Sequence, residues 1–184
     1  MSWNGIHGPF ESDGQRYWSA NERDVRVYFA GKGPAAEDAH GAAIKPTRHD
    51  VLQRLAPGAP PVAWAKQVHS AKVLAAVPNA RSTSPDLDGC CGEGDALVVP
   101  RSVGLALAIA TADCVPVLFA GPSALGAAHA GWRGLASGVI PATIAELERL
   151  GEGAGSLTAW IGPAIGPCCY EVDSDVAEVI ARAG

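Results

Sequence analysis

The sequence predicts one α/β domain with a sheet that is covered on both faces. Its 184 residues, 48% of them hydrophobic, fit a single domain with an ordinary core. Four apolar segments of strand length follow one another between residues 95 and 129. They hardly alternate with polar residues, as expected of strands buried on both faces. Apolar residues at helical spacing follow in residues 135–150.

The N-terminal quarter is predicted to be irregular at first and then to form a strand and a helix. Residues 1–24 are polar and Gly-rich, and we expect a loose extension there before a domain over residues 25–184. Residues 25–31 have the composition of a strand. Thr47 and Asp50 resemble a capping box at the start of a short helix.

The next part is predicted to contain two strands and a long loop. Residues 62–69 and 71–77 are expected to form a pair of strands joined near Ser70. The Gly, Pro, Ser and Asp content of residues 78–94 favours an exposed connection, and connections of this length are often functional.

The remaining elements are predicted from apolar runs and from the turn formers between them. The four central strands are predicted at residues 95–99, 103–111, 114–120 and 125–129. Pro141 requires either a helix start or a kink within residues 135–150. A further strand is predicted over residues 157–161, and a final helix is expected to begin at Ser174.

Charge and cysteine content limit the partners and the compartment. The chain has 14 Lys and Arg against 19 Asp and Glu, a net charge of −5, which argues against a nucleic-acid or membrane-surface partner. No apolar run is long enough for a membrane helix, and the N-terminus lacks the pattern of a secretory signal, so we expect a cytoplasmic protein. The neighbouring pairs Cys90–Cys91 and Cys168–Cys169 are expected to be small buried residues rather than disulfides.

Three candidate functional residues stand at the ends of apolar strands, namely His69, Cys114 and His129. If residues 114–120 and 125–129 form a hairpin, Cys114 lies near His129. Two imidazoles and a thiolate can hold a catalytic zinc ion with one position open for water. The same residues also suit a metal-free hydrolase with Cys114 as nucleophile and His129 as general base, and the spacing does not separate these interpretations.

Several neighbours could assist this trio, although each also has an ordinary structural role. Asp113 could orient a histidine or transfer a proton, or it could cap a turn. Arg133 could bind phosphate or a carboxylate, or it could form a surface ion pair. Trp132 could stack on a flat ring, although packing is the commoner role of such a side chain.

Five motifs in this order closely resemble one family, variously called multicopper polyphenol oxidase (laccase-like), purine nucleoside phosphorylase and peptidoglycan editing factor. They are KQVH at 66–69, GDALV at 94–98, TADCVPVLF at 111–119, HAGWRGL at 129–135 and IGPAIGPCCYEV at 161–172. The resemblance implies a mixed central sheet flanked by helices, similar to the fold of Cys–His deamidating toxins. It also implies a metal site of His69, Cys114 and His129, usually zinc, with copper in the oxidase context.

The resemblance further implies phosphorolysis of adenosine, inosine and methylthioadenosine, and deamination of adenosine. Arg133 and Arg48 are then the candidates to hold phosphate. An amide hydrolase acting on cell-wall precursors, a laccase-like polyphenol oxidase, an inactive paralogue and a homo-oligomer are alternatives that the family leaves open. The chain departs from the family pattern at residues 31–41, where an Arg is expected, and it stops at Gly184, before the family's usual C-terminal segment.

Overall fold

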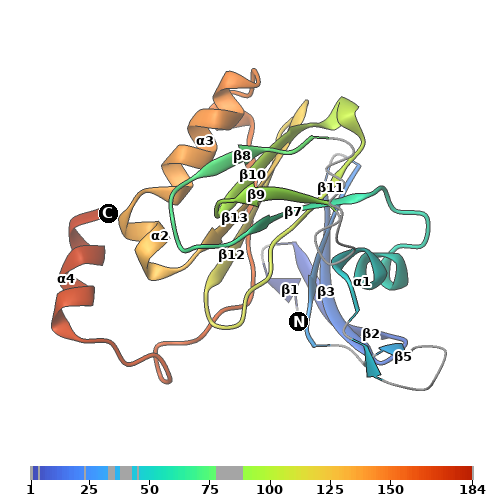
Figure 1. Cartoon of the computed structure of the whole chain (residues 1–184), viewed down its shortest axis with the longest axis horizontal. Helices are drawn as coiled ribbons and strands as arrows, with labels where there is room; N and C mark the ends of the chain where they lie inside the picture. Colours follow the sequence, from blue (N-terminus) through green and yellow to red (C-terminus); the bar gives the residue numbers. More distant parts are fainter. Residues whose placement is uncertain are drawn as a thin grey trace. The chain divides into compact units, whose positions relative to one another are not determined.

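The computed structural model describes residues 2–3, 5–22, 24–32, 36–37, 43–44, 46–77 and 89–183. Its contacts divide the chain into two compact units, Met1–Pro61 and Val62–Gly184, and each is described by itself. Strands in several sheets, together with flanking helices, give the mixed α/β class that the sequence predicts (Figure 1). No helix among the described residues is both long and apolar enough to cross a membrane.

The first unit is built on a four-stranded antiparallel sheet in the order β1-β2-β3-β4. Its strands are β1 (Ser2–Trp3), β2 (Ile6–Ser12), β3 (Gln15–Glu22) and β4 (Val25–Ala30). The predicted loose extension over residues 1–24 is therefore wrong, whereas the strand at residues 25–31 is confirmed. The hairpin between β2 and β3 turns at Asp13 and Gly14, whose φ angles of 48° and 72° suit the Asp-Gly turn that favours hairpins.

The same unit contains a two-stranded ribbon and one helix. The ribbon pairs β5 (Ala36–Glu37) with β6 (Ala43–Ile44), and the helix is α1 (Arg48–Leu55). The predicted capping box is confirmed, because the Asp50 amide donates to Thr47 Oγ1 at 3.1 Å and the Thr47 amide donates to Asp50 Oδ2 at 2.8 Å.

The second unit contains a five-stranded mixed sheet and a three-stranded parallel sheet (Figure 1). The larger sheet has the order β14 (Thr158–Ile161), β12 (Val115–Ala120), β13 (Ala124–Ala130), β10 (Ala96–Pro100) and β8 (Val73–Ala75). The smaller one has the order β11 (Ala106–Ala108), β7 (Val62–Lys66) and β9 (Cys90–Glu93). In the larger sheet, β8 and β10 are parallel and the other neighbours are antiparallel.

Three expectations for this unit need correction. The strands predicted at residues 62–69 and 71–77 do not pair with each other, because β7 and β8 belong to different sheets. Residues 103–111 hold the end of a short 3-10 helix, η2 (Arg101–Val103), and the brief strand β11 instead of one long strand. Residues 78–88 of the predicted loop lie outside the described residues, and β9 occupies most of residues 89–94.

Helical structure comes after the β12–β13 hairpin. The predicted helix at residues 135–150 is two helices, α2 (Trp132–Ala136) and α3 (Val139–Arg149), separated where Gly138 has a φ of 84°. Pro141 lies in the first turn of α3, where its missing N–H costs no hydrogen bond. The chain continues through the 3-10 helix η3 (Ala154–Ser156) and β14 to α4 (Ser174–Ala183).

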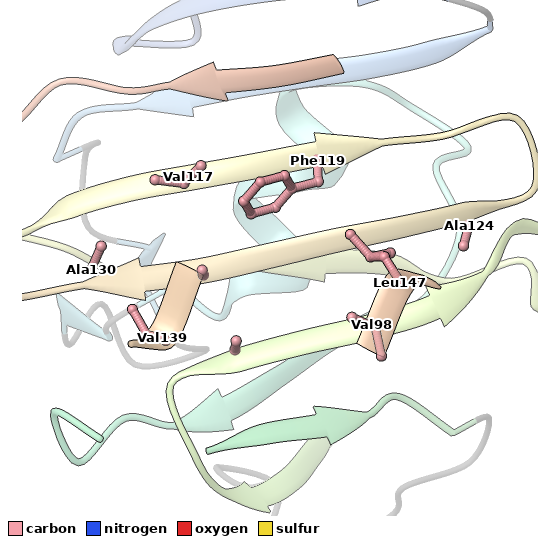
Figure 2. Packing of buried hydrophobic residues seen from close by; sticks show 9 residues of the cluster. Val98, Val117, Phe119, Ala124, Ala130, Val139 and Leu147 are labelled. Carbon is pink, nitrogen blue, oxygen red and sulfur yellow. The ribbon is translucent and has the colours of Figure 1, made fainter. Parts of the chain in front are cut away.

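The core of this unit lies on both faces of β10. On one face, Val98 belongs to a cluster with Val139 and Leu147 of α3 and with Phe119 of β12 (Figure 2). On the other, Leu97 and Val99 pack with alanines of β7 and with Ala76. The prediction of strands buried on both faces is thus confirmed for β10, and the hairpin that carries the candidate site rests against this core.

Candidate metal centre

The β12–β13 hairpin brings two of the candidate residues together. Pro116 lies opposite His129, and Val115 lies opposite Ala130, in the antiparallel register. Cys114 immediately precedes β12, so it lies beside the end of β13 that carries His129. The predicted hairpin around residues 121–123 is confirmed, together with the proximity that it implies.

His69 joins this pair from the segment between β7 and β8. The candidate ligand atoms of His69, Cys114 and His129 all lie within 4.8 Å of one another. Cys114 Sγ lies 4.0 Å from His69 Nε2, and the two imidazole rings meet edge to face with centroids 4.9 Å apart. His129 is buried, Cys114 is half-buried and His69 is exposed, so the cluster reaches solvent on the His69 side.

A buried carboxylate, Asp95, orients His129. Asp95 Oδ1 lies 2.9 Å from His129 Nδ1, and the Asp95 side chain is fully buried. Burial favours a higher pKa for Asp95, but hydrogen bonds from His129, Ser70 and His69 outweigh it and hold the pKa below its usual value. An ionised carboxylate can only accept, so the proton lies on Nδ1 and Nε2 keeps its lone pair for a ligand.

The same carboxylate folds the segment that carries His69. The backbone amides of Val68, His69 and Ser70 donate to Asp95 at 2.6–3.2 Å, and Ser70 Oγ donates to it at 2.8 Å. His69 has a φ of 60°, a left-handed conformation that is uncommon outside glycine and costs of order 1 kcal/mol. The hydrogen bonds to Asp95 offset this cost and place the His69 ring against Cys114.

Gly131 leaves the space in which the three side chains meet. A Cβ atom at this position would lie 3.0 Å from Cys114 Sγ and 3.0 Å from His69 Cδ2. Both distances are at the lower limit for carbon contacts, so a side chain here would displace the candidate ligands. Two imidazole nitrogens and one thiol, brought together in this way, fit a transition-metal ion of the zinc or copper type.

The environment of Cys114 keeps its thiol protonated in the metal-free chain. Burial, followed by the charges of Asp113 and Asp95, raises the pKa of Cys114. No lysine or arginine of the described residues contributes to this shift, in contrast to the electropositive surroundings of activated cysteines. A bound cation would reverse this preference, because metals bind the thiolate form.

The structure also places the remaining predicted site residues. Asp113 is exposed next to Cys114, and its carbonyl accepts a hydrogen bond from the Ile165 amide at 3.0 Å. The Arg133 guanidinium lies 4.4 Å from the Trp132 ring centroid in α2 and is exposed. Arg48 begins α1 in the first unit, so its predicted role in phosphate binding stays a prediction.

Asp95, whose carboxylate holds both His129 and the segment of His69, is not among the residues that the sequence patterns select. The signal that could have found it is its position, since it is an acidic residue directly before the fully apolar run of β10. A carboxylate at the edge of a buried strand needs several hydrogen-bond donors to offset its burial, so such a residue indicates that other segments converge on it.

The comparison with protein families matches residues 33–184 to the model described as multi-copper polyphenol oxidoreductase laccase. The chain is 44% identical over 119 residues to a purine nucleoside phosphorylase of Xylella fastidiosa (strain 9a5c), covering 61% of this chain and 42% of that protein. It is 36% identical over 157 residues to the purine nucleoside phosphorylase YlmD of Geobacillus stearothermophilus, covering 80% and 57%. The chain therefore spans about half the length of the curated relatives that it matches.

Solved structures are similar to the chain over nearly its whole length. The crystal structure of the hypothetical protein YfiH of Bacillus licheniformis is similar with a TM-score of 0.69 and 25% identity, covering 97% of this chain and 72% of that one. The crystal structure of YlmD from Geobacillus stearothermophilus is similar with a TM-score of 0.62 and 28% identity, covering 97% and 65%. The fold predicted from the sequence is that of these neighbours.

Proposed function

The chain belongs to the multi-copper polyphenol oxidoreductase laccase family, and we propose that it is a metal-dependent purine nucleoside enzyme centred on His69, Cys114 and His129. The observation that carries the proposal is the convergence of three ligand atoms within 4.8 Å, next to Gly131, whose missing side chain lets Cys114 and His69 approach. The nucleoside class is supported by relatives named purine nucleoside phosphorylase. The acidic composition supports a small-molecule substrate rather than nucleic acid, and we place the protein in the cytoplasm.

We assign His129 Nε2, His69 and the Cys114 thiolate as the ligands, and zinc as the metal. Two histidines and one cysteine are a suitable ligand set for catalytic zinc, with the fourth position left for water or substrate. When bound, zinc supplies Lewis acidity and makes hydroxide available near neutral pH. His69 is exposed, which supports access of substrate from that side.

Other residues of the chain then have separate proposed roles. Asp95 holds the proton of His129 on Nδ1 and fixes the backbone of His69, so the two rings are oriented before any ligand arrives. Asp113, exposed beside Cys114, is suited to move a proton to or from a purine nitrogen. Arg133 is the candidate to hold phosphate for phosphorolysis.

A second candidate function is that of a Cys–His amide hydrolase. The 4.0 Å separation of Cys114 Sγ and His69 Nε2 supports it, because contacts between nucleophile and base are often longer in ligand-free enzymes. This differs from the sequence-based hypothesis, in which His129 is the base. The raised pKa of Cys114 weighs against a metal-free thiolate nucleophile.

The decisive experiment combines metal analysis with product analysis. We expect close to one equivalent of zinc per chain, lost in Cys114→Ser and retained in the control Cys90→Ser. Incubation with adenosine should give ribose 1-phosphate and adenine when phosphate is present, or inosine when deamination dominates. Zinc binding with neither product would overturn the nucleoside assignment. Amide hydrolysis that survives complete chelation of metal would favour the hydrolase. Copper binding with oxidation of a phenol would favour the oxidase alternative.

Gly131 offers a finer test of the ligand geometry. Gly131→Ala places a methyl group against Cys114 and His69, so we expect metal affinity to fall about tenfold or more, or roughly 1.4 kcal/mol. Gly155→Ala is the matched control, because nothing lies within 4 Å of a Cβ atom there. Equal zinc affinity of the two variants in a competition titration with a chromogenic chelator would contradict the proposed coordination.

A further inference from the structure

The chain has two pairs of neighbouring cysteines that differ in local structure. Cys90 and Cys91 belong to strand β9, where successive side chains point to opposite faces. Accordingly, Cys90 Sγ approaches the Gly92 carbonyl, and Cys91 Sγ approaches the Gly89 carbonyl. Both are partly buried, close to the sequence-based expectation.

Cys168 and Cys169 lie in a turn after β14, and their sulfur atoms face each other. The Cys169 amide donates to the Gly166 carbonyl at 3.0 Å, which closes the turn. The two Sγ atoms are 2.8 Å apart and both residues are exposed. The expectation of buried small residues is therefore wrong for this pair.

Two thiols in this arrangement favour a shared ligand over a bond to each other. One trans peptide holds the two Cα atoms about 3.8 Å apart, whereas disulfides normally span roughly 4.4–6.8 Å. A disulfide between them would be strained and easily reduced. The pair therefore persists as a dithiol whose exposed sulfurs can both reach one small soft ion.

We propose that Cys168 and Cys169 form a bidentate site for a soft, thiophilic ion, of which trivalent arsenic is the defining probe. This site is distinct from the centre of His69, Cys114 and His129, whose ligand atoms form a separate group. With an organic arsenic(III) oxide, two arsenic–sulfur bonds form and two S–H bonds break. The arsenic-bound oxygen leaves with the two protons as water, so no oxidant or reductant is needed.

The segment that carries the pair also contacts the metal centre. The Ile165 amide donates to the carbonyl of Asp113, and the Gly162 amide donates to the carbonyl of Pro116, on either side of Cys114 in sequence. A ligand on the pair is thus held on a segment that is hydrogen-bonded to the residues flanking a candidate metal ligand. This makes it necessary to test the two sites separately.

The experiment uses the whole chain, reduced with a phosphine that is then removed, and treated with phenylarsine oxide. Native mass spectrometry should show one arsenical bound after a wash with excess 2-mercaptoethanol, which removes adducts of single thiols. A chelating dithiol, 2,3-dimercaptopropanol, should release it. Cys168→Ser and Cys169→Ser should each abolish the wash-resistant adduct, and their circular dichroism spectra should match the wild type because both positions are exposed.

Two further variants make the outcome specific. Cys114→Ser should retain the adduct, which separates this site from the metal centre. The double variant Cys90→Ser, Cys91→Ser should also retain it, since those sulfurs lie on opposite faces of a strand. Loss of the adduct in either control, or its persistence in Cys168→Ser, would overturn the proposal.

Discussion

The two ends of the β12–β13 hairpin are each organised by one buried carboxylate, but with different consequences. At the end that carries Cys114 and His129, Asp95 accepts hydrogen bonds from several backbone amides, one serine hydroxyl and an imidazole. At the turn end, Glu152 accepts from the Ser123 and Ala124 amides at 2.6 Å, and from the hydroxyls of Ser123 and Ser156.

The difference lies in what each carboxylate holds in place. Glu152 fixes a turn, and all its described partners are backbone amides and serine hydroxyls of the turn and of η3. Asp95 fixes two side chains that converge on a common point, and it also supports the left-handed backbone of His69. The same chemistry therefore serves stability at one end and, by our proposal, metal binding at the other.

The largest effect is expected from Asp95→Asn. An amide cannot accept from all of these donors, and its NH₂ group would face backbone N–H groups, so we expect a loss of roughly 3 kcal/mol in the free energy of unfolding. Metal affinity should fall about 10–100-fold, because His129 loses the group that fixes its proton on Nδ1. Urea unfolding of metal-free protein and a zinc competition titration measure the two effects. Unchanged zinc affinity in a folded variant would contradict the positioning role.

Glu152→Gln should lower the stability of the chain and leave its zinc affinity unchanged. Removal of the charged acceptor at the turn should cost about 2 kcal/mol in the free energy of unfolding. Zinc affinity should stay within about twofold of wild type, since no described contact of Glu152 reaches a candidate ligand. Glu148→Gln, an exposed change on α3, is the control and should leave both quantities unchanged. Weaker zinc binding in Glu152→Gln would mean that the two ends are coupled.

The sequence predicted those features that depend on neighbouring residues. The capping box at Thr47, the hairpin around residues 121–123 and the strand at residues 158–161 all rest on local signals, and all are present. The Asp13–Gly14 turn has an equally local signal, yet the polar composition of residues 1–24 predicts a loose extension where β2 and β3 are found. The assignment of β7 and β8 to different sheets depends on distant strands, which local patterns do not specify.

The candidate site likewise has some features that local sequence predicts and others that depend on distant residues. His69, Cys114 and His129 could be selected because each lies at one end of an apolar segment, and the hairpin explains how two of them meet. The position of His69 depends on hydrogen bonds to a carboxylate 26 residues away, which no spacing rule predicts. Gly131 matters through the space that it leaves, and that becomes evident only when the surrounding side chains are placed.

The smallest expected effect is the pH dependence of the stability that Glu152 contributes. Burial favours a higher pKa for this group, but hydrogen bonds from Ser123, Ala124 and Ser156 outweigh it and lower the pKa below its usual value. A depressed carboxyl pKa contributes stability above the pKa of the unfolded chain, about 4.3 for glutamate, and this contribution is lost as the pH falls through the folded pKa.

The stability difference between wild type and Glu152→Gln should therefore be full at about pH 7 and should narrow below about pH 4. Urea unfolding of both proteins across this range, without metal, measures the difference and cancels the titration of carboxylates that the two share. A difference that stays constant down to about pH 3 would mean that the turn is held by the shape of the Glu152 side chain and not by its charge. In that case Glu152 would stabilise its end of the hairpin through the shape of its side chain, and only Asp95 would act through its charge.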